Sequence, residues 1–252
     1  MTLNTTPSDH YLNLPGAQLV PTTASLTTGD NLTTVLSANA MMCVHGPNGL
    51  GKTLAVKANL RDQAPNHTIW LHLTSRSLPT IRTALFTQLQ LPGDPPTKAA
   101  TADALLTETL NQQPHVLVCD EAQQLDTPAF EYFRALWETT TNVAVIFIGA
   151  ENCYRKISNR PALASRILTW QQFEPLRPEE VLRVIPRFHP VWEPADPEDL
   201  LWVDDLACHG NFRNWAKVTF HLQDALHRRP DEKLNRELLG WVFSRLDSNV
   251  RR

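Results

Sequence analysis

The chain has 252 residues, of which 42% are hydrophobic and 19% are charged, and its formal net charge is -3. A chain of this length and apolar content can bury a substantial core, in one large domain or in a core domain with a small second one. The small net charge excludes a global field that attracts polyanions, so any contact with nucleic acid must come from a local basic face.

The cysteines are widely spaced, without a C-x-x-C pair and without histidines at zinc-ligand spacing: Cys43, Cys119, Cys153 and Cys208. This pattern indicates buried thiols in a reducing compartment. The sequence shows no basic region followed by an apolar stretch at its start, and no apolar run of the ~18–20 residues that a membrane span needs. We therefore expect a cytoplasmic protein with no membrane partner.

The first part of the chain leads into a buried strand. Residues 1–21 are rich in Thr, Ser, Asn and Pro and almost uncharged, which predicts an extended or mobile N-terminal arm. Helix-capping residues at 27–30 precede a short predicted helix over 31–36. The apolar run 41–45 ends at a glycine, which predicts a strand that feeds a loop.

Helices and strands then alternate. Helical periodicity covers 54–60, an apolar run at 68–73 predicts a second strand, and a helix is predicted over 78–91. The Pro/Gly cluster at 91–96 ends that helix, and an Ala/Leu/Thr-rich helix follows over 99–111.

The apolar runs 116–119 and 143–148 predict a third and a fourth strand, separated by a helix over 128–140, and 167–171 predicts a further short strand. Strands that are apolar throughout and alternate with helices indicate a parallel sheet covered on both faces.

Beyond residue 173 the pattern is helical only and is interrupted by prolines. This change predicts a domain boundary. We expect an N-terminal arm over 1–21, an α/β core over 22–172 and a helical lid over 173–252.

A glycine-rich loop lies between the first predicted strand and the next helix, and it matches G-x-x-x-x-G-K-[ST]. Glycines let backbone N–H groups turn inward around a phosphate, and the helix N-terminus adds the positive end of its dipole. Lys52 can reach the β- and γ-phosphates, and the Thr53 hydroxyl can ligate Mg²⁺. The residues predicted to bind ATP are Gly46, Pro47, Asn48, Gly49, Leu50, Gly51, Lys52 and Thr53.

Two carboxylates, Asp120 and Glu121, directly follow the third predicted strand. Ligands of open parallel sheets bind at the carboxyl ends of the strands, so we expect this pair and the phosphate loop to face one crevice. Asp120 fits a direct or water-mediated partner of Mg²⁺, and Glu121 fits the group that polarises the attacking water. Strand ends are often acidic, but a position 67 residues after Thr53, with strand and helices between, favours the catalytic role.

The phosphate loop together with Asp120-Glu121-Ala122-Gln123 resembles the AAA+ branch of P-loop ATPases. The chain looks most like the compact ATPases that assist DNA transposition (the MuB, TnsC and TniB type), and more distantly like the IstB and DnaC loaders. The resemblance covers roughly residues 20–225. It implies a three-layer αβα core with a parallel sheet, followed by a small helical lid.

The resemblance also implies roles for two arginines. The segment 162–167 is similar to the one that presents an arginine to the γ-phosphate held by a neighbouring subunit, so Arg166 is the candidate arginine finger and Arg160 the alternate. A cation supplied in trans couples hydrolysis to oligomerisation. Gly210-Asn211-Phe212-Arg213 is similar to the G-N-x-R motif of sensor 2, so Arg213 is expected to reach the nucleotide. Ordinary structural or surface arginines are the alternative.

One position departs from the family pattern. A polar sensor 1 residue usually follows the glycine after the fourth strand, whereas Gly149 is followed here by Ala150. Either Glu151 or Asn152 supplies the polar group from a slightly different place, or hydrolysis is slow, as suits a timer or a filament switch.

Related transposition ATPases assemble around duplex DNA as rings or helical filaments. By that resemblance we expect a homo-oligomer that contacts DNA phosphates without sequence preference. The candidate contacts are Arg76 and Arg82, after the second strand, and Lys98, at the start of the next helix. Solvated surface charge is the alternative for each.

Four functions fit these features. The first is an AAA+ ATPase that binds DNA non-specifically, oligomerises with ATP, and selects target DNA for, or recruits and activates, a transposase. The second is a helicase loader or replication accessory ATPase of the same fold. The third is an ExeA-like ATPase that switches a protein partner without DNA. The fourth is a nucleotide-binding scaffold with negligible hydrolysis, which Ala150 favours.

Overall fold

The structure, a computed structural model, describes residues 14–71, 77–229 and 231–246. Contacts divide the chain into two units. The α/β unit comprises Thr27–Asn48 and Ala55–Phe173, and the helical unit comprises the described residues of 1–26, Gly49–Leu54 and 174–252. No helix in the described residues is long and apolar enough to cross a membrane.

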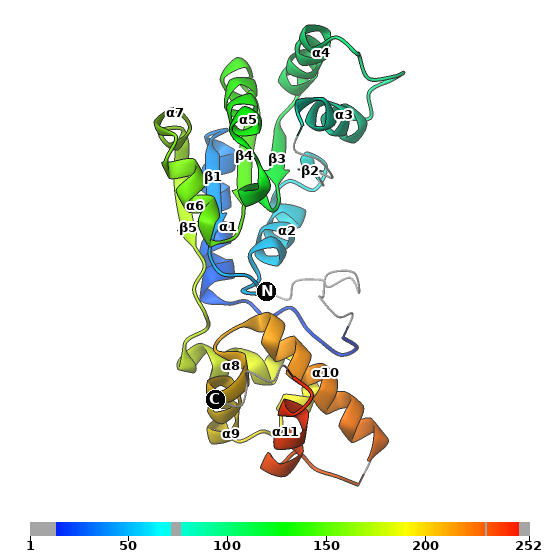
Figure 1. The fold of residues 1–252 in the computed structure, drawn as a ribbon, viewed down its shortest axis with the longest axis vertical. Helices are drawn as coiled ribbons and strands as arrows, with labels where there is room; N and C mark the ends of the chain where they lie inside the picture. The colour runs from blue at the N-terminus through cyan, green and yellow to red at the C-terminus, as the bar shows by residue number, and fades with distance from the viewer. Residues whose placement is uncertain (1–13, 72–76, 230, 247–252) are drawn as a thin grey trace. The chain divides into compact units, whose positions relative to one another are not determined.

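The α/β unit is built on a five-stranded parallel sheet with the strand order β2-β3-β4-β1-β5 (Figure 1). The strands are β1 (Met41–His45), β2 (Thr68–Leu71), β3 (His115–Cys119), β4 (Val143–Ile148) and β5 (Ile167–Gln172). Every residue of β1, β3 and β4 is buried, as expected for central strands covered on both faces. The predicted α/β fold with a parallel sheet is confirmed.

Helix α1 (Thr23–Ser37) precedes β1. The helices that connect the strands are α2 (Lys52–Gln63), α3 (Leu78–Gln88), α4 (Ala99–Gln112), η2 (Ala122–Gln124), α5 (Thr127–Thr139), α6 (Glu151–Ser158) and α7 (Pro161–Ala164). The side chain of Asp126 caps α5 by accepting the N–H of Ala129 at 2.9 Å, and a proline stands in its first turn. Alternate strand residues pack with α3–α7 in one core, where Phe147 lies edge-on to Phe130 and Phe133.

The helical unit contains α8 (Pro178–Phe188), η3 (Pro190–Trp192), α9 (Pro197–Val203), the π-helical η4 (Asp204–Cys208), α10 (Phe212–Arg228) and α11 (Arg236–Phe243). Its core is centred on two buried indoles, Trp192 and Trp215, whose ring centroids lie 5.2 Å apart with an interplanar angle of 87°.

Part of the segment expected to form a mobile arm is packed in the helical unit. Leu14 and Val20 belong to the helical core, and the N–H of Gln18 donates to the carbonyl of Phe188 at 2.8 Å. His189 Nε2 lies 2.9 Å from the carbonyl oxygen of Pro15. Two apolar side chains anchor this stretch. The polar composition of the segment as a whole did not indicate this anchoring. Residues 1–13 of the expected arm lie outside the described residues.

Candidate nucleotide-binding site

The predicted phosphate loop follows β1, and α2 begins at Lys52, two residues earlier than the predicted helix. Gly46, Gly49 and Gly51 have φ values of 136°, 87° and 89°, a backbone region that strains other residues. A Cβ on Gly46 would lie 2.4 Å from the carbonyl oxygen of Phe173, whereas one on Gly51 would meet nothing within 4 Å. The loop therefore has the left-handed glycine geometry that turns backbone N–H groups toward a phosphate.

The second half of this loop lies against the start of α10 within the helical unit. The N–H of Arg213 donates to the carbonyl of Gly49 at 3.1 Å. A Cβ on Gly49 would meet Asn211 Oδ1 at 2.4 Å and Arg213 Cβ at 2.9 Å. Asn211 caps α10, because its Oδ1 accepts the N–H groups of Arg213 and Asn214. The structure thus brings together two motifs that are widely separated in the sequence.

The two carboxylates lie at the carboxyl edge of the sheet. Asp120 directly follows β3, and Gly46 directly follows β1, which is two strands away in the sheet. Strands are about 4.8 Å apart, so the two chain segments leave the sheet roughly 10 Å from one another. Asp120 Oδ1 accepts the N–H of Glu121 at 2.9 Å, and Glu121 has a left-handed backbone with a φ of 53°. A left-handed backbone in a residue other than glycine is uncommon and often marks a functional site.

Gln123, the last residue of the Asp-Glu-Ala-Gln motif, connects Glu121 to the turn after β4. Its Nε2 donates to Glu121 Oε2, and its Oε1 accepts the N–H of Ala150 at 2.9 Å. Ala150 is the position where the family pattern places a polar residue. Glu151 and Asn152, the residues expected to compensate, are both exposed on the first turn of α6. No spacing pattern in the sequence predicts this contact of Gln123, because it depends on the adjacency of β3 and β4.

Arg166 lies at the opposite edge of the sheet. It directly precedes β5, so it stands at the amino edge, while Asp120 and Glu121 stand at the carboxyl edge. Its guanidinium is held by Glu138, by the carbonyl of Ala162 and by the hydroxyl of Ser165. Arg166 is therefore separated from the carboxylates of its own chain by the length of a strand.

Arg160, the alternate finger, is held between α6 and the first turn of α5. Its Nη1 donates to the carbonyl of Lys156, its Nη2 donates to Thr127 Oγ1 at 2.5 Å, and its guanidinium carbon lies 5.2 Å from the ring centroid of Phe130. Its Nε is buried without a hydrogen-bond partner among the described residues.

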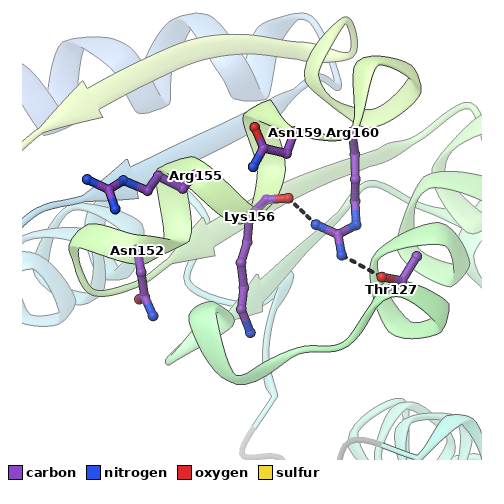
Figure 2. Close-up of a pocket in the computed structure, with 6 residues that line it drawn as sticks. All are labelled: Thr127, Asn152, Arg155, Lys156, Asn159 and Arg160. Atoms are coloured by element: carbon purple, nitrogen blue, oxygen red, sulfur yellow. Dashed lines mark hydrogen bonds between the residues drawn. The ribbon is translucent and has the colours of Figure 1, made fainter.

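A pocket of about 510 Å³ opens beside this arginine (Figure 2). The residues that line it all have polar or charged side chains: Thr127, Asn152, Arg155, Lys156, Asn159 and Arg160. Figure 2 shows Arg160 reaching from the end of α6 toward Thr127, while the Arg155 side chain points away from it. The Lys156 amine donates to the carbonyls of Gln123 and Leu125, so it fixes the segment that follows the two carboxylates.

Of the candidate DNA contacts, Arg82 is engaged in an internal ion pair and Lys98 is exposed. Arg82 is paired with Asp103 at 2.7 and 2.9 Å and lies over the Tyr132 ring at 5.0 Å. This ion pair raises the pKa of Arg82 and lowers that of Asp103. Lys98 is exposed at the N-cap position of α4, and Arg76 lies outside the described residues. The guanidinium of Arg82 is already paired with Asp103, and its contact with DNA stays a prediction.

Comparisons with known proteins found similar sequences and similar folds. The sequence model of a family described as AAA domain matches residues 35–157. The Mu-like prophage FluMu DNA transposition protein B of Haemophilus influenzae is 26% identical over 122 residues, which make up 48% of this chain and 41% of that protein. The match therefore spans less than half of the length of this curated relative.

Solved structures share the fold at low sequence identity. Cdc6p from Pyrobaculum aerophilum has a TM-score of 0.73 and 15% identity, over 90% of this chain and 69% of that one. The Aeropyrum pernix ORC1 protein, solved in complex with DNA, has a TM-score of 0.67 and 16% identity, over 90% and 66%. The RuvB branch migration motor of Thermotoga maritima has a TM-score of 0.59 and 17% identity, over 88% and 69%. Residues 35–157 match the AAA domain family model, and the chain resembles the AAA+ ATPases that assist transposition.

Proposed function

We propose that this chain is a slow, oligomer-dependent ATPase that binds duplex DNA without sequence preference and selects target DNA for, or recruits, a transposase. The observation that carries the proposal is that Gly46, which has a positive φ and follows β1, and Asp120 and Glu121, which follow β3, lie at one edge of a parallel sheet. Parallel α/β sheets bind their ligands at this edge.

The residues fit ATP and Mg²⁺. The space beside Gly51 is open, Lys52 is buried with 7% of its surface exposed, and Thr53 is exposed on the first turn of α2. Thr53 and Asp120 would hold Mg²⁺, which when bound neutralises charge on the phosphates. Glu121 would accept the proton of the attacking water, and Arg213, beside the loop at Gly49, would sense the phosphates.

Oligomerisation follows in the proposal from Arg166. A guanidinium at the amino edge of the sheet cannot serve the carboxylates of its own chain, but in an assembly it can face the nucleotide of a neighbouring copy. The DNA and transposase parts rest on the similarity to a prophage transposition protein. A non-specific interface would use phosphate contacts, for which Arg76, Arg82 and Lys98 are the candidates.

Two measurements test the proposal. The first is ATP turnover of the wild-type chain and of Glu121→Gln, and turnover that is no lower in the variant rejects the catalytic assignment. The second is binding to random duplex DNA with ATP, with a non-hydrolysable analogue and with ADP, read by filter binding and negative-stain microscopy. ATP-dependent filaments or rings on DNA support the proposal, and absence of DNA binding in every nucleotide state rejects both DNA-based functions.

A further inference from the structure

The side chain of Gln123 uses both ends of its amide in the α/β unit. Nε2 donates to Glu121 Oε2, and Oε1 accepts the N–H of Ala150 at 2.9 Å. The two neighbours fix the orientation of the amide: a backbone N–H can only be met by the oxygen, and a carboxylate can only be met by the NH₂ group. Gln123 therefore cannot flip without losing both hydrogen bonds.

The backbone that carries Gln123 is also fixed. The Lys156 amine donates to the carbonyl of Gln123 and, at 3.2 Å, to that of Leu125 (Figure 2 shows the Lys156 side chain). Lys156 extends from α6, and Ala150 is the N-cap residue of the same helix. Residues of α6 and its N-cap thus bind both the main-chain carbonyl and the side-chain amide of Gln123.

The space around the amide leaves no room for adjustment. A Cβ on Gly149 would lie 2.7 Å from Gln123 Oε1 and 2.5 Å from Cys153 Cβ. The glycine at the end of β4 is therefore needed to let the amide reach the N–H of Ala150. A polar side chain at position 150 is not needed to supply a hydrogen bond here, because the backbone at Ala150 anchors an amide that arrives from residue 123.

We propose that Gln123 is a positioning residue for Glu121, and that it occupies the structural place that a polar residue after β4 would fill. This inference rests on the proposed function, in which Glu121 accepts a proton from water. The amide binds Oε2 and so fixes the carboxylate plane. Oε1 receives no hydrogen bond from any described residue, which leaves it able to accept the proton. The constraint also offsets the freedom of an exposed glutamate with three rotatable bonds.

Gln123→Glu gives the sharpest variant, because it keeps the shape and the acceptor toward Ala150 but replaces the donor by a second carboxylate. Two carboxylates in contact raise the pKa of one of them, and a proton shared between them restores a donor. We expect turnover of Gln123→Glu to be low at neutral pH and to recover partly as the pH falls. A side chain with a purely structural role would not shift the pH profile in this direction.

The test compares kcat and KM for ATP in the full chain, with duplex DNA present, for Gln123→Ala, Gln123→Glu and the control Gln124→Ala. Gln124 is adjacent and exposed, and its described hydrogen bonds involve only its backbone. We expect Gln123→Ala to lower kcat roughly ten- to a hundredfold, less than the 10²–10⁴-fold typical of losing a general base, with KM nearly unchanged. The control should match the wild type.

Each outcome has one meaning. If Glu121→Gln turns over as fast as the wild type, the proposed function fails. If Glu121→Gln is inactive while Gln123→Ala equals Gln124→Ala, only the role of Gln123 is overturned. A higher kcat in Gln123→Ala also overturns it, because the amide would then restrain Glu121 in an unproductive position. Titration with a fluorescent ATP analogue checks folding, and if Gln123→Ala does not bind it, the pH profile of the near-isosteric Gln123→Glu decides.

Discussion

The guanidinium of Arg166 is paired with the carboxylate of Glu138, whose Oε1 lies 2.8 Å from Nε and 2.7 Å from Nη2. Glu138 Oε2 accepts a hydrogen bond from Arg134 Nη1 at 2.5 Å, so one carboxylate is shared by two guanidinium groups. These hydrogen bonds, that of Arg134 first, lower the pKa of Glu138. An arginine that acts on a neighbouring subunit must leave this carboxylate before it can bind a phosphate.

Glu138→Gln should therefore make Arg166 easier to recruit. Exposed ion pairs contribute little, so we expect the protein concentration for half-maximal ATP turnover to fall roughly two- to fivefold. The matched control is Glu131→Gln, because Glu131 pairs with Arg134 but not with Arg166. Turnover measured over a concentration series checks this. Equal effects of the two substitutions, or an effect of Glu138→Gln that persists in an Arg166→Ala background, would contradict a role for Arg166 in trans.

Asn211 connects the stability of α10 to the phosphate loop. Replacing an N-cap asparagine by alanine costs about 1 kcal/mol, and Asn211→Ala should lose this amount in urea unfolding. It should also weaken ATP-analogue binding severalfold, because the Arg213 N–H that it caps also donates to Gly49. The control is Asn235→Ala, which removes the cap of α11, where Asn235 accepts the N–H of Leu238 at 2.8 Å. Equal losses of affinity in both variants would reject the link.

The sequence was most informative where structure is local. The apolar runs 41–45, 116–119 and 143–148 coincide closely with β1, β3 and β4, because a strand buried on both faces needs an unbroken apolar stretch. The phosphate loop was recognisable because its geometry depends on glycines at fixed spacing within eight residues.

Contacts between distant segments could not be predicted from the sequence. Gln123 reaches Ala150 only because β3 and β4 are neighbours in the sheet, and strand order is not encoded in any one segment. The pairing of Arg166 with Glu138 likewise joins the start of β5 to the end of α5. Leu14 and Val20 were hidden in a polar stretch, where two anchoring side chains do not alter the average composition.

Buried His115, next to half-buried His67 at the amino edge of the sheet, should make stability depend on pH. His115 is 6% exposed, both of its ring nitrogens lack partners among the described residues, and His67 lies edge-on at 6.4 Å. Burial, with a smaller contribution from His67, lowers the pKa of His115 from 6.5. His115 therefore binds a proton near pH 6.5 in the unfolded chain but only at lower pH in the folded chain. The unfolding free energy consequently falls as the pH drops below 6.5.

His115→Leu should remove part of this dependence. Between pH 7 and pH 5, the unfolding free energy of the wild type should fall relative to that of the variant by up to about 1.4 kcal/mol per pH unit, the limit for one proton. Urea titrations across this range measure the difference, with the exposed His227→Gln as the control. Parallel pH profiles for wild type and His115→Leu would show that His115 is protonated in the folded state as readily as in the unfolded one.

Thr219 is the buried hydrogen-bonding centre of the helical unit. Its Oγ1 accepts the indole N–H of Trp192 at 2.8 Å and donates to the carbonyl of Trp215 at 2.7 Å, and the residue is fully buried. Thr219→Val keeps the shape but leaves the Trp192 N–H without its acceptor. A buried polar group without a partner costs about 1–3 kcal/mol, so we expect a loss of that size in unfolding free energy.

Thr219→Ser separates the hydroxyl from the methyl group. Serine keeps both hydrogen bonds and loses one buried methyl, which costs about 1 kcal/mol, so the serine variant should be the more stable of the two. Tryptophan fluorescence during urea unfolding reads the result directly, because the hydroxyl contacts one indole and the backbone of the other tryptophan. A serine variant less stable than the valine variant would mean that packing around Thr219, rather than its hydrogen bonds, stabilises this core.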